Sequence, residues 1–132
     1  MANPKNITRT FGFRFSMTDA AVICLVIAAA GWLHRMENPL WWIVLVVVAH
    51  FFLFCNIFRI RRGYEYFWAG TFLLNVGFWL WRTKLDCLPV LAIQLPITAC
   101  VVLAEMRSRR YHGIFAARIN PRLNDYVEGQ IS

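Results

Sequence analysis

The basic residues of this chain are distributed unevenly around four apolar segments, which cover residues 18–34, 40–58, 64–81 and 87–104. Eleven of the fourteen Lys and Arg residues precede the first segment, connect the second to the third, or follow the fourth. The other two connections contain only three. Because membrane proteins keep their basic loops mainly in the cytoplasm, this alternation predicts four membrane crossings with both termini cytoplasmic.

The length of the segments supports the same interpretation. Each has 17 to 19 residues, and 18 helical residues extend about 27 Å, close to the hydrocarbon thickness of a bilayer. Lipid offers no hydrogen-bond partners, so the backbone groups must pair within each segment, as they do in an α-helix. The predicted fold is an all-α integral membrane protein with four transmembrane helices in an antiparallel, up-down bundle.

Two tails flank this transmembrane domain of residues 18–104. Residues 1–17 form a basic tail whose alternating phenylalanines, from Phe11 to Phe15, suit the headgroup region of a membrane. Thr18 and Asp19 are the expected N-cap of the first helix. Residues 105–132 form a second basic tail on the cytoplasmic side, with an apolar stretch at 114–119 that predicts an interfacial helix or a docking tail.

The formal net charge of +7 would favour nucleic-acid binding in a soluble protein. Here the basic residues flank apolar segments, so anionic lipid explains them better and we expect no nucleic-acid partner. Twelve of the fourteen are arginines, whose planar guanidinium binds phosphate in a bidentate way. The expected location is therefore the inner (cytoplasmic) membrane, with anionic lipids as partners.

The four cysteines, Cys24, Cys55, Cys87 and Cys100, lie within or at the edges of the apolar segments. They form no Cys-x-x-Cys motif and match no zinc or redox spacing. We interpret them as small buried apolar residues. The sequence predicts no metal site and identifies no cofactor.

Five polar residues lie inside the apolar segments at similar depth. Counted from the cytoplasmic ends, they lie roughly 9 to 16 Å deep on three consecutive segments. Lipid cannot satisfy such side chains, so we expect them to turn inward and meet. The candidate residues are His50, Thr71, Asn75, Gln94 and Thr98.

Two interpretations of this cluster are open. The side chains hold the helices in register, or they line a polar pocket for a lipid, a quinone or haem, with His50 as the proton carrier or ligand. His34 lies at the outer rim and His112 beyond the inner one, so only single-His haem ligation fits.

A second group of polar residues lies at the cytoplasmic rim. It predicts either charge-paired turns that anchor the protein or a clamp for anionic headgroups, each basic residue contributing on the order of 1 kcal/mol at an anionic surface. Asn56 and Arg59 are expected on one helical face, and Asp19 and Glu105 lie at the same level. The candidate headgroup residues are Asn56, Arg59, Arg61, Arg62, Glu65, Arg107, Arg109 and Arg110.

Small residues recur along one side of the first segment, which predicts a face for close helix packing: Ala20, Ala21, Cys24, Ala28 and Gly31. No hydrolytic triad is present, because the serines lie in the tails and no carboxylate lies deep enough to orient His50. The sequence therefore favours a non-catalytic subunit or assembly partner, in a homo-oligomer or a larger membrane complex. The alternative is an intramembrane ligand-binding or catalytic protein centred on His50.

Overall fold

A computed structural model describes residues 9–82 and 84–130, and within these ranges the chain is helical and contains no strand. This confirms the all-α class. Lys5 and the rest of the first eight tail residues lie outside the described residues. The elements are α1 (Met17–Arg35), α2 (Trp41–Phe52), the π-helix η1 (Leu53–Ile57), α3 (Arg62–Trp81), α4 (Cys87–Met106), α5 (Ala116–Ile119) and α6 (Leu123–Val127).

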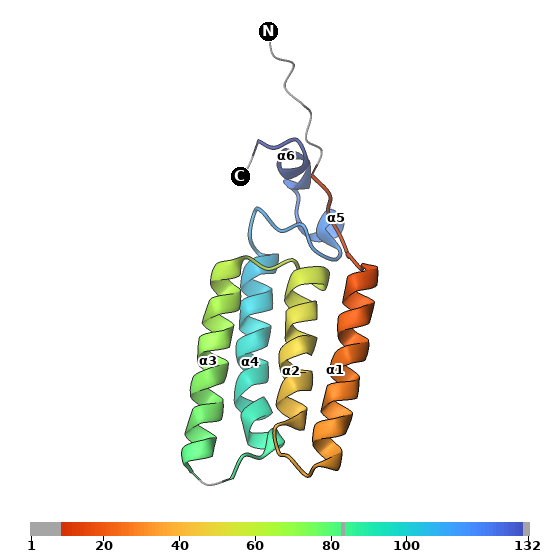
Figure 1. Cartoon of the computed structure of the whole chain (residues 1–132). Helices are drawn as coiled ribbons and strands as arrows, with labels where there is room; N and C mark the ends of the chain where they lie inside the picture. The colour runs from red at the N-terminus through yellow and green to blue at the C-terminus, as the bar shows by residue number, and fades with distance from the viewer. Residues whose placement is uncertain (1–8, 83, 131–132) are drawn as a thin grey trace.

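The long helices run side by side and alternate in direction (Figure 1). The second is α2 continued by η1. Each begins and ends within two residues of the expected segment. α1 packs against α2, and α3 packs against α4. Side chains of α2, η1, α3 and α4 form the main core, which is built around Trp42, Phe54, Trp68, Phe72, Val90 and Val101.

Two helices of the described part are long and apolar enough to cross a membrane. They are α1, with a mean hydropathy of 1.6, and α4, with 2.2. The stretch Trp41–Ile57, which joins α2 and η1, is a shorter apolar helix. Only 6 % of the residues in the apolar stretch of α1 are buried inside the protein, so most of this helix is exposed or half-exposed to the surroundings.

The first helix starts earlier than Thr18 and Asp19 predicted. Its N-cap is Ser16, whose hydroxyl accepts a hydrogen bond from the backbone N–H of Asp19 at 3.3 Å. The Asp19 carboxylate in turn accepts from the backbone N–H of Ser16 at 2.8 Å. Asp19 is thus the third helical residue of a capping box instead of the cap itself.

The second long helix ends in a π-turn, which the sequence pattern did not predict. The N–H of Phe58 donates to the carbonyl of Leu53 at 2.9 Å, five residues back. Arg59 then adopts a left-handed conformation with φ of +49°. The expectation that Asn56 and Arg59 share one helical face is therefore wrong, because the helix ends at Ile57 before Arg59 is reached.

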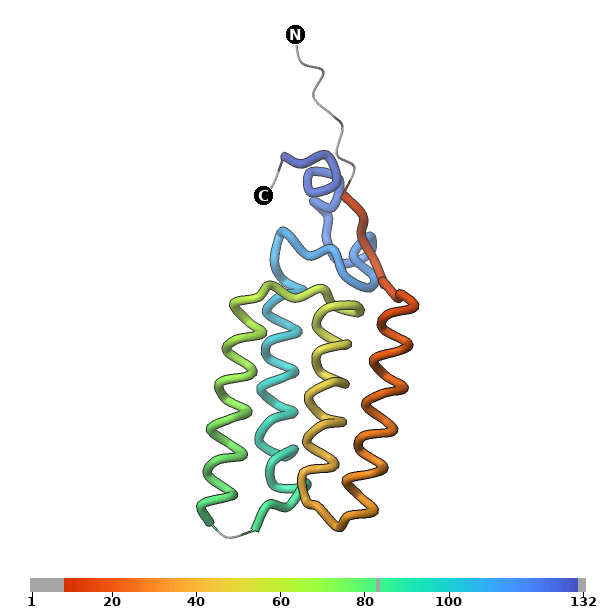
Figure 2. Tube along the Cα trace, in the orientation of Figure 1, coloured from red at the N-terminus to blue at the C-terminus, as the bar shows by residue number. Residues whose placement is uncertain are grey.

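Residues 9–14 and 107–130 fold together over one end of the long helices, and we call this unit the terminal cap (Figure 2). Gly12 donates its N–H to the carbonyl of His112 at 2.8 Å, and Arg9 donates to Val127 at 3.3 Å. A second small core forms beneath from Tyr111, Ala116 and Leu123. The second tail thus contains two short helices, α5 and α6, within a folded unit, where one interfacial helix or a docking tail was expected.

Candidate functional site

His50 connects α2 to α4 near the middle of the long helices. Its Nδ1 lies 2.8 Å from the carbonyl of Val46, and its Nε2 lies 3.1 Å from the hydroxyl of Thr98. In the neutral imidazole the carbonyl takes the Nδ1–H, so Nε2 accepts the hydroxyl proton. The side chain is only 8 % exposed. Both ring nitrogens of His50 are therefore occupied by partners within the protein.

Trp68 of α3 completes this contact between three helices. Its indole N–H donates to the Thr98 hydroxyl at 2.8 Å. Its ring stacks on His50, with centroids 4.4 Å apart, and on Phe72, with centroids 5.1 Å apart. Thr98 thus accepts a hydrogen bond from α3, and its single hydroxyl proton is shared between Nε2 of His50 on α2 and the carbonyl of Gln94, which lies 3.0 Å away. We call His50, Trp68, Thr71, Gln94 and Thr98 the polar network.

Gln94 and Thr71 extend the polar network along the α3–α4 interface. The Gln94 amide donates to the Thr71 hydroxyl and to the carbonyl of Trp68, both at 3.3 Å. The Thr71 hydroxyl itself donates to the Trp68 carbonyl at 2.8 Å. Gln94 is fully buried. The structure therefore brings four of the five predicted intramembrane residues together in one network.

The fifth, Asn75, is bonded separately. Its side-chain amide donates to the carbonyl of Val90 at 2.9 Å, which again joins α3 to α4. Three buried atoms of this region have no hydrogen-bond partner among the described residues: Asn75 Oδ1, Gln94 Oε1 and Trp79 Nε1. The α3–α4 interface thus contains three polar atoms that could still form hydrogen bonds, beside a polar network that is otherwise paired within the protein.

The geometry of His50 is that of a cross-link between helices. An axial haem ligand or a proton carrier needs a ring nitrogen that a ligand can reach, and here Thr98 and the Val46 carbonyl occupy both. One ring face is also covered by Trp68. The sequence analysis did not include Trp68 among the candidate residues and so missed this role. The spacing of Trp68, Thr71 and Asn75 along one helical face is the signal that could have revealed it.

At the rim beneath the terminal cap, Arg61 pairs with Glu105. The guanidinium Nε donates to Glu105 Oε2 at 3.1 Å. The Arg61 side chain is 47 % exposed and that of Glu105 only 1 %. The hydrogen bond to Glu105 raises the pKa of Arg61. Burial, with the Glu105 charge as a lesser cause, raises the pKa of the nearby Tyr111 to about 12.

The other predicted rim residues do not form a single clamp. Arg59 donates to the carbonyl of Thr10 at 2.8 Å and so holds the terminal cap. Glu65 accepts from the Cys55 thiol at 3.3 Å. Asn56 is buried, and its carbonyl accepts from the N–H of Arg14. Like Arg61, the four remaining predicted arginines are exposed at the rim: Arg62, Arg107, Arg109 and Arg110.

The cysteines are less buried than expected. Cys24 and Cys100 are exposed, and Cys55 and Cys87 are half-buried. The prediction of four buried cysteines is therefore wrong, because α1 and the outer side of α4 have no protein packed over these positions. Among the described residues, no three His, Cys, Asp or Glu side chains gather closely enough to hold a metal ion.

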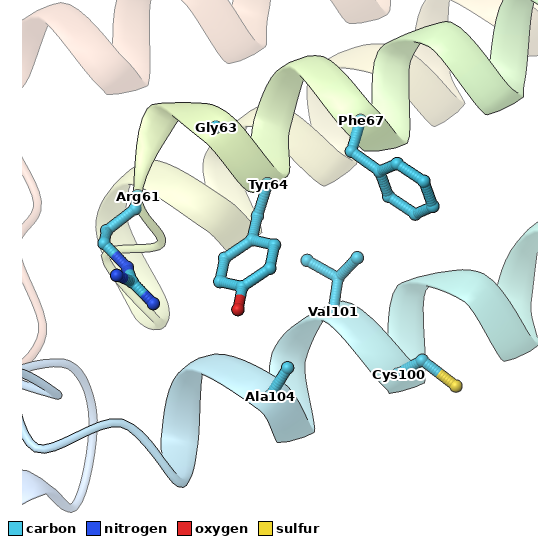
Figure 3. Close-up of a pocket in the computed structure, with 7 residues that line it drawn as sticks. All are labelled: Arg61, Gly63, Tyr64, Phe67, Cys100, Val101 and Ala104. Carbon is cyan, nitrogen blue, oxygen red and sulfur yellow. The ribbon is translucent and has the colours of Figure 1, made fainter.

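A groove lies between α3 and α4 at the end nearest the terminal cap (Figure 3). Its volume is about 630 Å³. α3 contributes an aromatic wall and α4 a wall of small residues, and Arg61 stands at one end of the groove. The lining residues are Arg61, Gly63, Tyr64, Phe67, Cys100, Val101 and Ala104.

The small-residue stripe of α1 points away from the rest of the protein. Ala21, Cys24, Ala28 and Gly31 are all exposed, whereas Ala20, the fifth predicted member, is half-buried. Residues of α1 that are at least half-buried, such as Ile23 and Ala30, lie on the opposite side of the helix. The stripe does not contribute to the packing of α1 on α2 and is available to another helix.

We compared the chain with models of protein families, with curated protein sequences and with solved structures. None of the three comparisons finds a match.

Proposed function

We propose that this protein is a small inner-membrane protein that crosses the bilayer four times and acts as a non-catalytic subunit or assembly partner. The observation that carries the proposal is the exposed small-residue stripe of α1, formed by Ala21, Cys24, Ala28 and Gly31. In lipid, small residues let two helix backbones approach closely enough for extensive van der Waals contact. The stripe therefore binds a helix of another membrane protein or of a second copy.

Several features support the four crossings. α1 and α4 meet the length and hydropathy of a membrane span. α3, with 20 residues, extends about 30 Å, enough to cross the hydrocarbon core. The described parts of both tails lie at one end of the long helices, as an even number of crossings requires. That end carries most of the arginines, and the positive-inside rule assigns it to the cytoplasm.

The basic rim anchors the protein in this orientation. Arg62, Arg107, Arg109 and Arg110 are exposed where the long helices meet the terminal cap. Each contributes on the order of 1 kcal/mol of attraction to an anionic inner leaflet. We propose anionic lipids as the general partner of this rim.

The test is purification of the tagged protein in a mild detergent, with the bound partners and the oligomeric state measured by native mass spectrometry. We expect the wild-type protein to retain a second copy or another membrane protein. Ala28→Leu places a bulky side chain on the stripe and should remove that partner. Ala29→Leu makes the same change at the next residue, which is also exposed but lies about 100° away around the helix.

Two results would contradict the proposal. One is a wild-type protein that is monomeric and carries no stoichiometric partner. The other is an Ala28→Leu variant that retains its partner as well as Ala29→Leu does.

A second candidate function is ligand binding near His50, for a lipid, a quinone or a single-His haem. It is supported by the buried carbonyl oxygens of Asn75 and Gln94, which a hydrogen-bond donor on a bound molecule would satisfy. An absorption spectrum and mass spectrometry of extracts from the purified protein test it. If a molecule is found, His50→Ala should release it and leave the fold intact. If His50 is a cross-link, the same substitution should lower stability instead.

A further inference from the structure

The groove between α3 and α4 has the dimensions and lining of a site for a hydrocarbon chain. Its two walls are apolar, with Tyr64 and Phe67 facing Val101 and Ala104 (Figure 3). Gly63, which has no side chain, and the small Ala104 keep the end nearest Arg61 open. A volume of about 630 Å³ lies within the range of small-molecule sites, roughly 300–1,000 Å³.

A charged group is fixed at one end of this apolar groove. The Nε of Arg61 is bonded to the buried carboxylate of Glu105, which holds the guanidinium in place while the side chain remains half exposed. Its centre lies 5.2 Å from the ring centroid of Tyr64, which restrains it further. A guanidinium has five N–H donors in all, so most of them remain for a ligand.

The charge balance around Arg61 is positive. Arg107, the C-cap of α4, follows the groove residue Ala104 by about one helical turn and is exposed. Arg61 and Arg107 together carry one more charge than the Glu105 carboxylate that pairs with Arg61. An anionic phosphodiester is attracted to this end of the groove, whereas the cationic group of a zwitterionic lipid is repelled by the same side chains.

We propose that the groove binds one acyl chain of an anionic phospholipid, with its phosphodiester at Arg61. A planar guanidinium binds phosphate oxygens in a bidentate way, which gives the headgroup a fixed position. The orientation is that of a lipid in the cytoplasmic leaflet, with the headgroup at the basic rim and the chain parallel to α3 and α4. The site uses no residue of α1. It rests on the proposed membrane topology and assigns the anionic lipid proposed for the basic rim to one groove.

The test is thermal unfolding of the purified full-length protein in a neutral detergent with added lipid. The additions are a short-chain phosphatidylglycerol, the matching phosphatidylcholine and glycerol phosphate without chains. We expect phosphatidylglycerol to stabilise the wild-type protein at a concentration at least about fivefold lower than phosphatidylcholine, the preference expected from one bound arginine. Glycerol phosphate should have no effect at these concentrations.

Two pairs of variants locate the site. Ala104→Phe fills the groove and should abolish the effect of phosphatidylglycerol, whereas Ala99→Phe, on an exposed part of α4 outside the groove, should leave it unchanged. Arg61→Gln combined with Glu105→Gln removes both charges, so no buried charge is left unpaired. That double variant should lose about fivefold in the preference for phosphatidylglycerol and keep its response to phosphatidylcholine.

The proposal is overturned if the two lipids stabilise the wild-type protein equally, or if glycerol phosphate alone reproduces the effect. It is also overturned if Ala104→Phe responds to phosphatidylglycerol as Ala99→Phe does. Ala28→Leu on α1 should bind the lipid normally, so failure of partner binding and failure of lipid binding are distinguishable.

Discussion

Thr98 is the residue through which three helices contact one another. Its hydroxyl accepts from the Trp68 indole of α3 and lies 3.1 Å from Nε2 of His50 on α2. Thr98→Val keeps the shape of the side chain and removes both contacts, which leaves two buried ring nitrogens without partners. We expect a loss of about 1–2 kcal/mol in the free energy of unfolding, measured by denaturant titration in detergent.

Thr71→Val is the matched comparison for Thr98→Val. The Thr71 hydroxyl donates within its own helix to the carbonyl of Trp68, and the Gln94 amide retains a second acceptor when that hydroxyl is removed. The loss of stability should therefore be smaller than for Thr98→Val. Equal losses in the two variants would show that Thr98 does not have a special position between the helices.

His112 makes the terminal cap sensitive to acid. Its ring stacks on Tyr126, with centroids 4.5 Å apart. Burial, and to a lesser extent the charges of Arg59 and Arg9, lowers the pKa of His112 below the usual 6.5, although its bond to the Arg110 carbonyl and the charge of Glu105 oppose this. The unfolded chain therefore binds a proton more readily than the folded one, and the cap loses stability as the pH falls below about 6.5.

Limited proteolysis at about pH 7.5 and about pH 5.5 measures this effect. We expect the wild-type cap to be cleaved faster at the lower pH. His112→Phe keeps a flat ring against Tyr126 and cannot be protonated, so its cleavage rate should change less with pH. An identical pH dependence in both proteins would remove His112 as the cause.

At the scale of single residues, the depth of a polar side chain along its predicted helix was the sequence signal that indicated which residues lie close together. His50, Thr71, Gln94 and Thr98 were placed at similar depth from the rise of a helix alone. The structure joins the side chains of His50 and Thr98, and of Gln94 and Thr71, and the Thr98 hydroxyl also bonds to the Gln94 carbonyl. The role of Trp68 was not predicted, because tryptophan near a helix end usually belongs to the membrane surface. Its indole N–H instead turns inward, where Thr98 offers an acceptor.

At the scale of elements, the terminal cap docks on the turn after η1 through close backbone contact. A Cβ at Gly113 would lie 2.5 Å from the carbonyl oxygen of Phe58, which is backbone and cannot easily move. The neighbouring N–H of Ile114 donates to the carbonyl of Ile57 at 2.8 Å. Gly113→Ala should therefore push the cap away and cost about 1–3 kcal/mol, seen as faster hydrogen exchange in residues 107–130.

Gly70→Ala provides the control for this substitution. Gly70 lies inside α3, and a Cβ there meets no atom within 4 Å. Alanine is also a better helix former than glycine, so this variant should exchange no faster than the wild-type protein. Normal protection of the cap in Gly113→Ala would contradict the proposed contact with Phe58.

The end of the second long helix shows why this part of the fold was not predictable. The residues 53–57 are apolar apart from Asn56, and nothing in their pattern distinguishes a π-turn from an α-helix. The π-turn is stabilised from outside, because the carbonyl of Asn56 accepts from Arg14 and that of Ile57 from Ile114. Its cause lies in contacts that are far away in the sequence.

At the scale of the whole molecule, the arrangement predicts the side of the membrane on which each segment lies. A fluorescent protein that folds only in the cytoplasm should be active when fused to either end of the chain. Alkaline phosphatase, which is active only outside the cytoplasm, should be active after Glu37, in the connection between α1 and α2. Activity patterns that place the two ends in opposite compartments would exclude the four-crossing topology.

The hydrogen bonds of the terminal cap also set an order of assembly. The backbone partner of Gly12 is His112, 100 residues later, and that of Arg9 is Val127, 118 residues later. During synthesis the amino-terminal segment must therefore wait until the last helix and the residues after it have left the ribosome. A chain that stops early, or whose last helix fails to insert, leaves this segment uncovered, and an uncovered basic, phenylalanine-rich segment distinguishes an unfinished molecule from a complete one.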